Sequence, residues 1–234
     1  MRTYRLPTLR KSATLYLLLI TMMAYILQTL TEIYFGYDYL AFFGSKINQF
    51  ILSGQVWRFI TPVFLHGSIL HLIFNMYALY SIGPGLEKRF GTWSFLALYL
   101  VGGLWGNALS FLLTPNASLG ASTAIFSLIA AQGVYIYKNR AILGSAAQQM
   151  LMNIGMIVLV NLALGLSPGV DNWGHIGGLL GGLFFSWFAS PTYGVVEGLF
   201  GSRVVVSRDN RIVLITIASV FIAVGLIAIK FLFS

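Results

Sequence analysis

The sequence predicts an all-α polytopic membrane protein, and three observations carry this prediction. Hydrophobic residues make up 58% of the 234 residues and charged residues only 9%, whereas a soluble domain carries about 25% charged residues. The mean hydropathy is +0.83, and apolar runs long enough to cross a bilayer as helices recur along the chain. The absence of cysteine excludes a disulfide scaffold and any thiolate site.

Seven apolar runs, each close to the 20 residues that a membrane-spanning helix needs, are separated by polar or charged segments. The predicted spans are 13–30, 68–86, 93–113, 119–137, 148–166, 173–190 and 212–233. The first run could instead be a signal peptide, because a basic segment precedes it. No A-x-A cleavage site follows it, however, and we expect a membrane helix.

The distribution of positive charge predicts the orientation of these spans. Eleven of the 14 lysines and arginines fall on one side of the predicted membrane, whereas Lys46, Arg58 and Lys230 fall on the other. We therefore expect a cytoplasmic tail over 1–12, a cytoplasmic linker over 191–211 and a C-terminus outside. This pattern explains the net charge of +8 without nucleic-acid binding, for which no basic aromatic module is present.

One outer connection, residues 31–67, is long for a loop and contains ten aromatic residues. Aromatic side chains concentrate at the headgroup level of a bilayer. We expect this loop to form an interfacial structure that lies partly in the outer leaflet.

Polar side chains inside spans are costly and point to function. Spans two, four and six are all predicted to run inward from the outer face. His71, Ser122 and His175 each lie three or four residues into one of these spans, and Asn75 lies one turn below His71. At 1.5 Å per residue they share a depth of roughly 5 Å below the outer ends.

Such a set suits nucleophilic acyl transfer. A serine hydroxyl such as that of Ser122 needs an adjacent base, and a buried, neutral His175 can serve. His71 and Asn75 share one helix face and can donate hydrogen bonds to an oxyanion. The Ser122 amide, in the first turn of a helix, is a third donor.

Small residues predict how these helices approach each other. Gly174, Gly178 and Gly182 are spaced four apart around His175, which forms a face for close helix packing. Gly120 and Ala121, beside Ser122, are also small. Close contact between spans four and six would bring Ser122 and His175 within hydrogen-bonding distance.

Together these residues resemble the rhomboid intramembrane serine proteases over about residues 55–187. The resemblance rests on an ordered set of motifs: Trp57-Arg58, His66 with His71 and Asn75, Glu87-Lys88-Arg89-Phe90-Gly91, Gly120-Ala121-Ser122, and His175 with its glycine face. It implies a six-helix core over 13–190. The last span, 212–234, resembles the additional helix of the six-plus-one subclass.

The resemblance also implies roles and an activity. Ser122 would be the nucleophile and His175 the general base, with His71, Asn75 and the Ser122 amide as the oxyanion site. Other positions would support the site or the fold: Phe126, which matches the aromatic residue that packs on the catalytic histidine, Gly120, Gly178, Trp57, Arg58, Glu87 and Arg89, with a cap formed by 167–172. The family cleaves transmembrane substrates, here expected to be single-pass proteins, near the outer membrane boundary. No metal or cofactor is implied, and we expect a prokaryotic plasma membrane.

Three positions leave alternatives open. Thr123 stands where the family usually has glycine or alanine, so it could crowd the packing or bond back to an upstream carbonyl. Asp171, four residues before His175, could orient the histidine as in a triad, although a solvated loop carboxylate is favoured. His66, at the border of the loop, is either structural or functional.

Three rival functions follow from the same residues. An inactive rhomboid-like protein that binds transmembrane clients has Thr123 as its support. A metal-dependent hydrolase would use His66, His71 and His175, but no H-E-x-x-H motif or acidic cluster accompanies them. A transporter would be expected to show an inverted repeat, which the spans do not.

Overall fold

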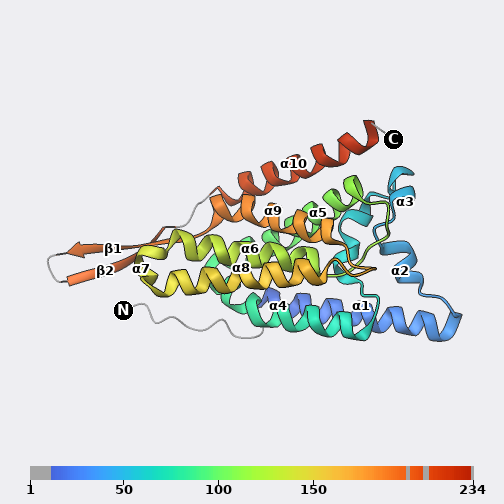
Figure 1. The fold of residues 1–234 in the computed structure, drawn as a ribbon, viewed down its shortest axis with the longest axis horizontal. Helices are drawn as coiled ribbons and strands as arrows, with labels where there is room; N and C mark the ends of the chain where they lie inside the picture. The colour runs from blue at the N-terminus through green and yellow to red at the C-terminus, as the bar shows by residue number, and fades with distance from the viewer. Residues whose placement is uncertain (1–11, 199–200, 208–210, 233–234) are drawn as a thin grey trace.

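The structure, a computed structural model, describes residues 12–198, 201–207 and 211–232. It is a bundle of long helices that lie side by side (Figure 1). The long helices are α1 (Ala13–Phe35), α4 (Ile69–Phe90), α5 (Thr92–Leu113), α6 (Ser122–Lys138), α8 (Ala146–Leu164), α9 (Asn172–Ala189) and α10 (Ile212–Leu232). They correspond to the seven predicted spans, which confirms the predicted fold class. The shorter elements are α2 (Tyr39–Gly44), α3 (Asn48–Leu52), two 3₁₀ turns η2 (Val56–Phe59) and η3 (Thr61–Phe64), α7 (Arg140–Leu143), β1 (Thr192–Gly198) and β2 (Gly201–Ser207).

Within the described residues, five helices are long and apolar enough to cross a membrane by themselves: α1, α4, α5, α8 and α10. The two others, α6 and α9, occupy the interior. α6 has only 17 residues, and α9 carries Asn172, His175 and several glycines. Because both helices pack mainly against protein, neither needs the apolar surface that lipid demands.

The centre of the bundle is formed by α5, α6 and α9, which approach closely through glycines. A Cβ atom on Gly177 would lie 2.6 Å from the carbonyl oxygen of Trp105 on α5, and one on Gly182 would lie 2.5 Å from the Cα of Ser127 on α6. Such contacts leave no room for a methyl group. The predicted glycine face of α9 is therefore a packing surface on both α5 and α6.

Glu87, near the end of α4, holds the start of α1. Its buried carboxylate accepts hydrogen bonds from the Ala13 amide (2.7 Å), the Thr14 amide (3.0 Å) and the hydroxyls of Ser12 and Thr14 (2.9 and 2.8 Å). It thus caps a helix whose first amides lack intrahelical partners. Arg89 lies over the ring of Tyr135, with 4.7 Å from its guanidinium carbon to the ring centroid.

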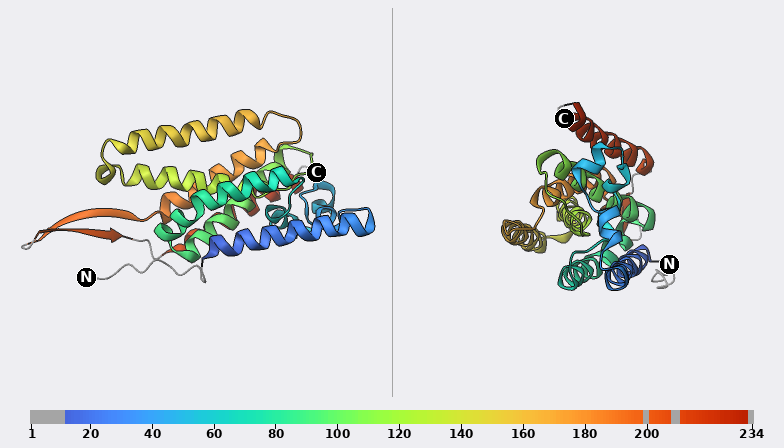
Figure 2. Two further views of the ribbon diagram at one scale, coloured as in Figure 1. Left: turned by 90° about the horizontal axis from the view of Figure 1, so that it is seen from below. Right: turned by 90° about the vertical axis from the view of Figure 1, so that its right-hand side faces the viewer.

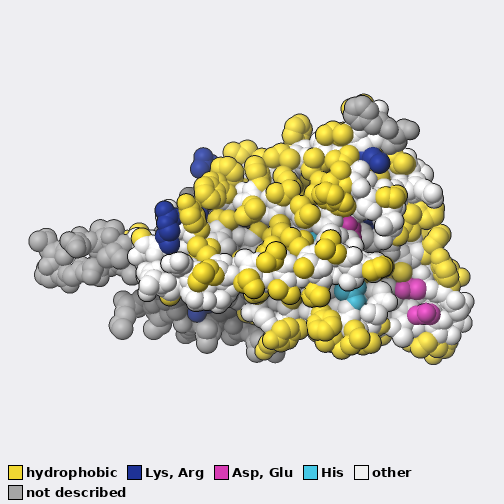
Figure 3. All heavy atoms as spheres, viewed as in Figure 1, with side chains coloured by type: hydrophobic (Ala, Val, Ile, Leu, Met, Phe, Trp, Pro, Cys, Tyr) yellow, Lys and Arg dark blue, Asp and Glu magenta, His cyan; other side chains and the backbone are white. Residues whose placement is uncertain are grey.

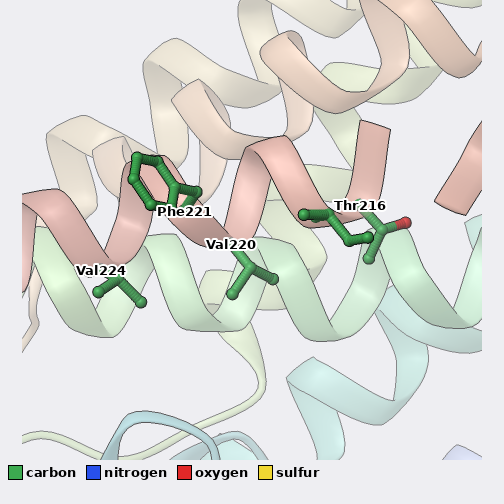
Figure 4. Close-up of a pocket in the computed structure, with 5 residues that line it drawn as sticks. Thr216, Val220, Phe221 and Val224 are labelled. Carbon is green, nitrogen blue, oxygen red and sulfur yellow. The ribbon is translucent and has the colours of Figure 1, made fainter. Parts of the chain in front are cut away.

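α8 lies at the periphery, and α10 packs along α5 (Figure 2). Trp105 on α5 donates its indole N–H to the carbonyl and hydroxyl oxygens of Ser219 on α10 (2.9 and 3.1 Å). Another side of α10 carries an apolar groove, shown in Figure 4 and lined by Thr216, Ile217, Val220, Phe221 and Val224. The Thr216 hydroxyl is bonded to the Ile212 carbonyl, so the groove suits a hydrocarbon environment.

Residues 191–211, predicted as a cytoplasmic linker, contain the antiparallel hairpin β1–β2, in which Thr192 pairs with Ser207. The hairpin projects beyond one end of the bundle, which we call the hairpin end (Figure 1). Asn139 fastens its base, because Asn139 accepts a hydrogen bond from the Tyr193 amide (2.8 Å) and donates one to the Pro191 carbonyl (3.0 Å). No strand was predicted here from the sequence.

The loop 31–67 is folded. α1 continues to Phe35, five residues past its predicted end, and α2, α3, η2 and η3 follow. Aromatic rings make edge-to-face contacts through it: Tyr37, Tyr39, Phe42, Phe43 and Phe50. Apolar side chains are spread over the described part of the face that Figure 3 shows.

Candidate active site

Three helices begin at the end of the bundle opposite the hairpin, which we call the site end (Figure 1). α4 starts at Ile69, α6 at Ser122 and α9 at Asn172. Ser122 Oγ and His175 Nε2 lie 3.0 Å apart, within hydrogen-bonding distance. The structure therefore brings together two side chains that are 53 residues apart in sequence.

Gly120 shapes the approach to Ser122. Its φ angle of +134° is one that side-chain-bearing residues rarely adopt, and its amide donates to the Pro62 carbonyl (2.9 Å). A Cβ atom there would lie 2.6 Å from Cε1 and 2.8 Å from Nε2 of His71. The glycine thus allows the His71 ring to lie against this backbone, on the side that Ser122 Oγ also faces.

His175 is held by packing on one ring face. The ring of Phe126, one turn below Ser122 on α6, stacks on it with centroids 4.4 Å apart and an interplanar angle of 15°. The His175 Nδ1 atom is buried and has no hydrogen-bond partner. Its ring is thus positioned by stacking and by the contact with Ser122.

Both earlier interpretations of Asp171 are wrong. Asp171 is the N-cap of α9, where it accepts a hydrogen bond from the Gly174 amide (2.9 Å). Its other oxygen accepts one from the Ser110 hydroxyl on α5 (2.5 Å). It is therefore neither the third member of a triad nor a freely solvated carboxylate, but it fixes the helix that carries His175.

The three predicted oxyanion donors differ in their position and in the hydrogen bonds that they already make. The Cε1–Nε2 edge of the His71 ring lies against Gly120, on the side of Ser122 Oγ. Asn75 is buried, and one of its amide N–H groups donates to the His71 carbonyl (2.9 Å), which leaves the second N–H available. Ser122 is the first residue of α6, so its amide has no partner within the helix.

Thr123 fits because its neighbours are glycines. A Cβ on Gly106 would lie 2.5 Å from Thr123 Cβ, and one on Gly174 would lie 3.1 Å from Thr123 Cγ2. The missing methyl groups on α5 and α9 make room for the branched side chain. Thr123 Oγ1 is buried without a partner, so the alternative in which it bonds back to an upstream carbonyl is wrong. Gly178 on α9 lies against the backbone of Thr123 on α6.

Trp57 and Arg58 bind the backbone of the outer loop. The Trp57 indole N–H donates to the Phe43 carbonyl (2.9 Å). The fully buried Arg58 donates to the Ser45 carbonyl (2.7 Å) and to Gln55 Oε1 (2.8 Å). Burial lowers the pKa of the Arg58 guanidinium.

Two residues that the sequence analysis missed support the site. Ser110 anchors Asp171, and Gln28 on α1 binds the backbone of His66. Both are buried polar residues within spans, and that feature alone could have marked them. In the described part of the chain, no group of three or more His, Asp or Glu side chains could hold a metal ion.

Comparison with known proteins shows which family the chain is related to. The Rhomboid domain matches residues 53–192. The chain is 38% identical to "Rhomboid protease GluP" of Bacillus subtilis (strain 168) over 186 residues, 79% of this chain and 34% of that protein. It is 39% identical to "RHOMBOID-like protein 2" of Arabidopsis thaliana over 189 residues, 76% of this chain and 58% of that protein. The chain thus spans between a third and three fifths of these relatives' lengths.

The apolar helices and these matches define an integral multi-pass membrane protein. The chain belongs to the rhomboid family.

Proposed function

We propose that this protein is an intramembrane serine endopeptidase that uses a Ser122–His175 dyad. The observation that carries the proposal is the 3.0 Å contact between Ser122 Oγ and His175 Nε2. A rhomboid protease from Bacillus subtilis as a relative supports the same reading.

The geometry suggests the following steps. His175 Nε2 takes the proton of the Ser122 hydroxyl as Oγ attacks the scissile carbonyl carbon. The carbonyl π electrons move to oxygen, and the resulting oxyanion accepts hydrogen bonds from the Ser122 amide, the His71 ring and the free Asn75 N–H. The oxyanion then re-forms the carbonyl, the C–N bond breaks with its electron pair on nitrogen, and His175 gives its proton to that nitrogen, which leaves an acyl-enzyme on Ser122 Oγ. Water, deprotonated by His175, hydrolyses the acyl-enzyme and regenerates Ser122.

The site end would face the outside of the cell and the hairpin end the cytoplasm. Substrates would be single-pass transmembrane proteins cut near the outer face. A membrane helix bonds all its own backbone groups, so it must unwind locally before its peptide carbonyl can reach Ser122. Residues that weaken the substrate helix should therefore favour cleavage.

The test is cleavage of a labelled single-pass substrate by purified protein reconstituted in vesicles. Ser122→Ala should abolish cleavage and labelling by a serine-reactive phosphonate. Ser81→Ala is the matched control, because that hydroxyl is exposed on α4 and bonds only its own helix (Tyr77 carbonyl, 2.7 Å). Undiminished cleavage by Ser122→Ala would refute the dyad. A wild type that cleaves nothing and takes no label would favour the inactive, client-binding alternative.

The orientation has its own test, which the absence of cysteine makes simple. Ser53 lies in the outer loop and Ser145 near the hairpin end, and both are exposed. In intact cells, an impermeant thiol reagent should label Ser53→Cys and spare Ser145→Cys. The reverse pattern would overturn the proposed orientation.

A further inference from the structure

His66 is a buried histidine outside the proposed dyad. It is only 1% exposed, and neither of its ring nitrogens has a hydrogen-bond partner. Its ring lies 5.0 Å from that of His71, centroid to centroid, with an interplanar angle of 64°. A pair of imidazoles so close, one of them beside Ser122, calls for a chemical explanation.

Leaving both nitrogens of His66 unpaired would be expensive. A buried polar group without a partner has lost its hydrogen bonds to water and gained none in the protein. Burial lowers the pKa of His66 to about 3, so its ring is neutral and carries one N–H donor and one acceptor. The Phe64 backbone also lies near the ring and has a smaller, opposing effect on this pKa. The His71 ring is the neighbouring side chain that can pair with a neutral His66, because its own nitrogens offer one donor and one acceptor.

The backbone holds the His66 ring at this place. Gln28 on α1 accepts a hydrogen bond from the His66 amide (3.0 Å) and donates one to the His66 carbonyl (3.2 Å). The Gln28 side chain also donates to Asp38 (2.8 Å). The His66 backbone is therefore tied to α1, close to the start of α4.

His71 can serve an oxyanion only in one of its two neutral forms. Its Nε2 edge lies against Gly120 on the side of Ser122, so the useful proton is on Nε2. Its Nδ1 atom must then be an acceptor, and a donor facing Nδ1 would stabilise that tautomer. A centroid separation of 5.0 Å is compatible with one hydrogen bond between ring nitrogens or with one bridging water.

We propose that His66 is a positioning residue that donates a hydrogen bond to His71 Nδ1, directly or through one water, and so keeps the His71 proton on Nε2 beside Ser122. The catalytic consequence rests on the proposed function, whereas the tautomer itself does not. The relay would join α1, through Gln28 and His66, to the oxyanion site.

The chain offers a direct measurement, because it contains only three histidines. ¹⁵N-histidine labelling gives six ring nitrogen signals, assigned by variants at each position. The measurement is made in the Ser122→Ala background, so it does not depend on turnover. Wild-type His66 should give His71 as a single Nε2–H tautomer. If His71 is mainly the Nδ1–H form in that sample, in which His66 is unchanged, the proposal is overturned.

Substitutions then test the link. His66→Phe keeps the ring volume but cannot donate, and it should produce a mixture of His71 tautomers. His66→Asn and His66→Gln retain an N–H group, and at least one should restore the single form. Thr21→Val is the control, because Thr21 is another fully buried residue with an unpartnered hydroxyl, on α1, and it should leave His71 unchanged. If His66→Phe also leaves the His71 signals unchanged, the proposal is refuted.

Kinetics separate this inference from the proposed function. With Ser122 present, His66→Phe should lower kcat about tenfold at nearly constant KM, because an oxyanion donor acts only in the transition state. The polar variant that restores the tautomer should restore kcat. A parallel rise of KM, or no rescue, would contradict positioning. If Ser122→Ala still cleaves while the His71 tautomer still depends on the residue at position 66, the proposed dyad is refuted and the inference about His66 is not.

Discussion

Gly178→Ala is expected to part α6 from α9 and to break the contact between Ser122 and His175. A Cβ at position 178 lies 2.9 Å from the carbonyl carbon and 3.2 Å from the Cα of Thr123, and closer still to the carbonyl oxygen. These atoms belong to the α6 backbone, so no rotamer change relieves the overlap. Carbon contacts are favourable only from about 3.5 Å, so the helices must separate by roughly 1 Å.

The consequence for the site follows from the helix geometry. His175 lies one turn before Gly178 on α9, so its Nε2 atom moves with the helix from its present 3.0 Å to beyond hydrogen-bonding distance of Ser122. A misplacement of about 1 Å can cost a factor of 100 in rate. We expect a loss of that order, together with about 1–3 kcal/mol of stability from overpacking.

The assay combines the rate of phosphonate labelling of Ser122 with thermal unfolding in one detergent. Gly155→Ala is the matched control, because it adds the same methyl group to α8, where no heavy atom lies within 4 Å of the new Cβ. It should keep the wild-type labelling rate, and its free energy of unfolding should rise by up to about 1 kcal/mol because alanine has a higher helix propensity than glycine. Labelling of Gly178→Ala within twofold of wild type would refute the packing argument.

Two further predictions concern Thr123 and Lys46. Thr123→Val should raise the free energy of unfolding by about 1 kcal/mol, because it keeps the shape and removes a buried hydroxyl without a partner. Lys46, in the outer loop, is fully buried and donates to the carbonyls of Thr114 and Asn116 (3.2 and 2.7 Å). Burial lowers its pKa from 10.5 to about 8 despite the opposing effect of Asp171. Between those two pH values the unfolded chain binds more protons, so stability should rise with pH.

Each of these predictions has a clear contrary result. Thermal unfolding checks the first, with Thr123→Ser as the control that keeps the hydroxyl, and a lower melting temperature for Thr123→Val would contradict it. Denaturant titrations at pH 8 and pH 10.5 check the second. The rise should be absent from Lys46→Met, and an equal rise in both proteins would assign it to other groups.

The sequence determined those features that depend on the local chain. Hydropathy located seven helices, because a span must be apolar over about 20 residues wherever it packs. The sequence also singled out His71, Asn75, Ser122 and His175, because polar groups are rare within such spans. Motif order was sufficient for the family, which the matching Rhomboid domain confirms.

The predictions for Asp171 and for residues 191–211 were wrong or incomplete because the local sequence fits more than one structure. Asp171 precedes a helix, and its spacing fits both a cap and a partner of the histidine. The hairpin β1–β2 lies in a segment that was interpreted from its positive charges alone. Its valines stand next to one another and do not alternate with polar residues, so the strand pattern is weak. Hydropathy therefore contained no signal strong enough to separate a strand from a linker.

The tertiary structure alone decided which helices touch. Periodicity gives each helix a face, but not the neighbour that this face meets. Only the packing of α5, α6 and α9 shows that Gly106 and Gly174 make room for Thr123, and that Ser122 and His175 lie 3.0 Å apart. The reason is physical: contacts between helices depend on backbone distances of a few ångströms, which small residues permit and which no single segment encodes.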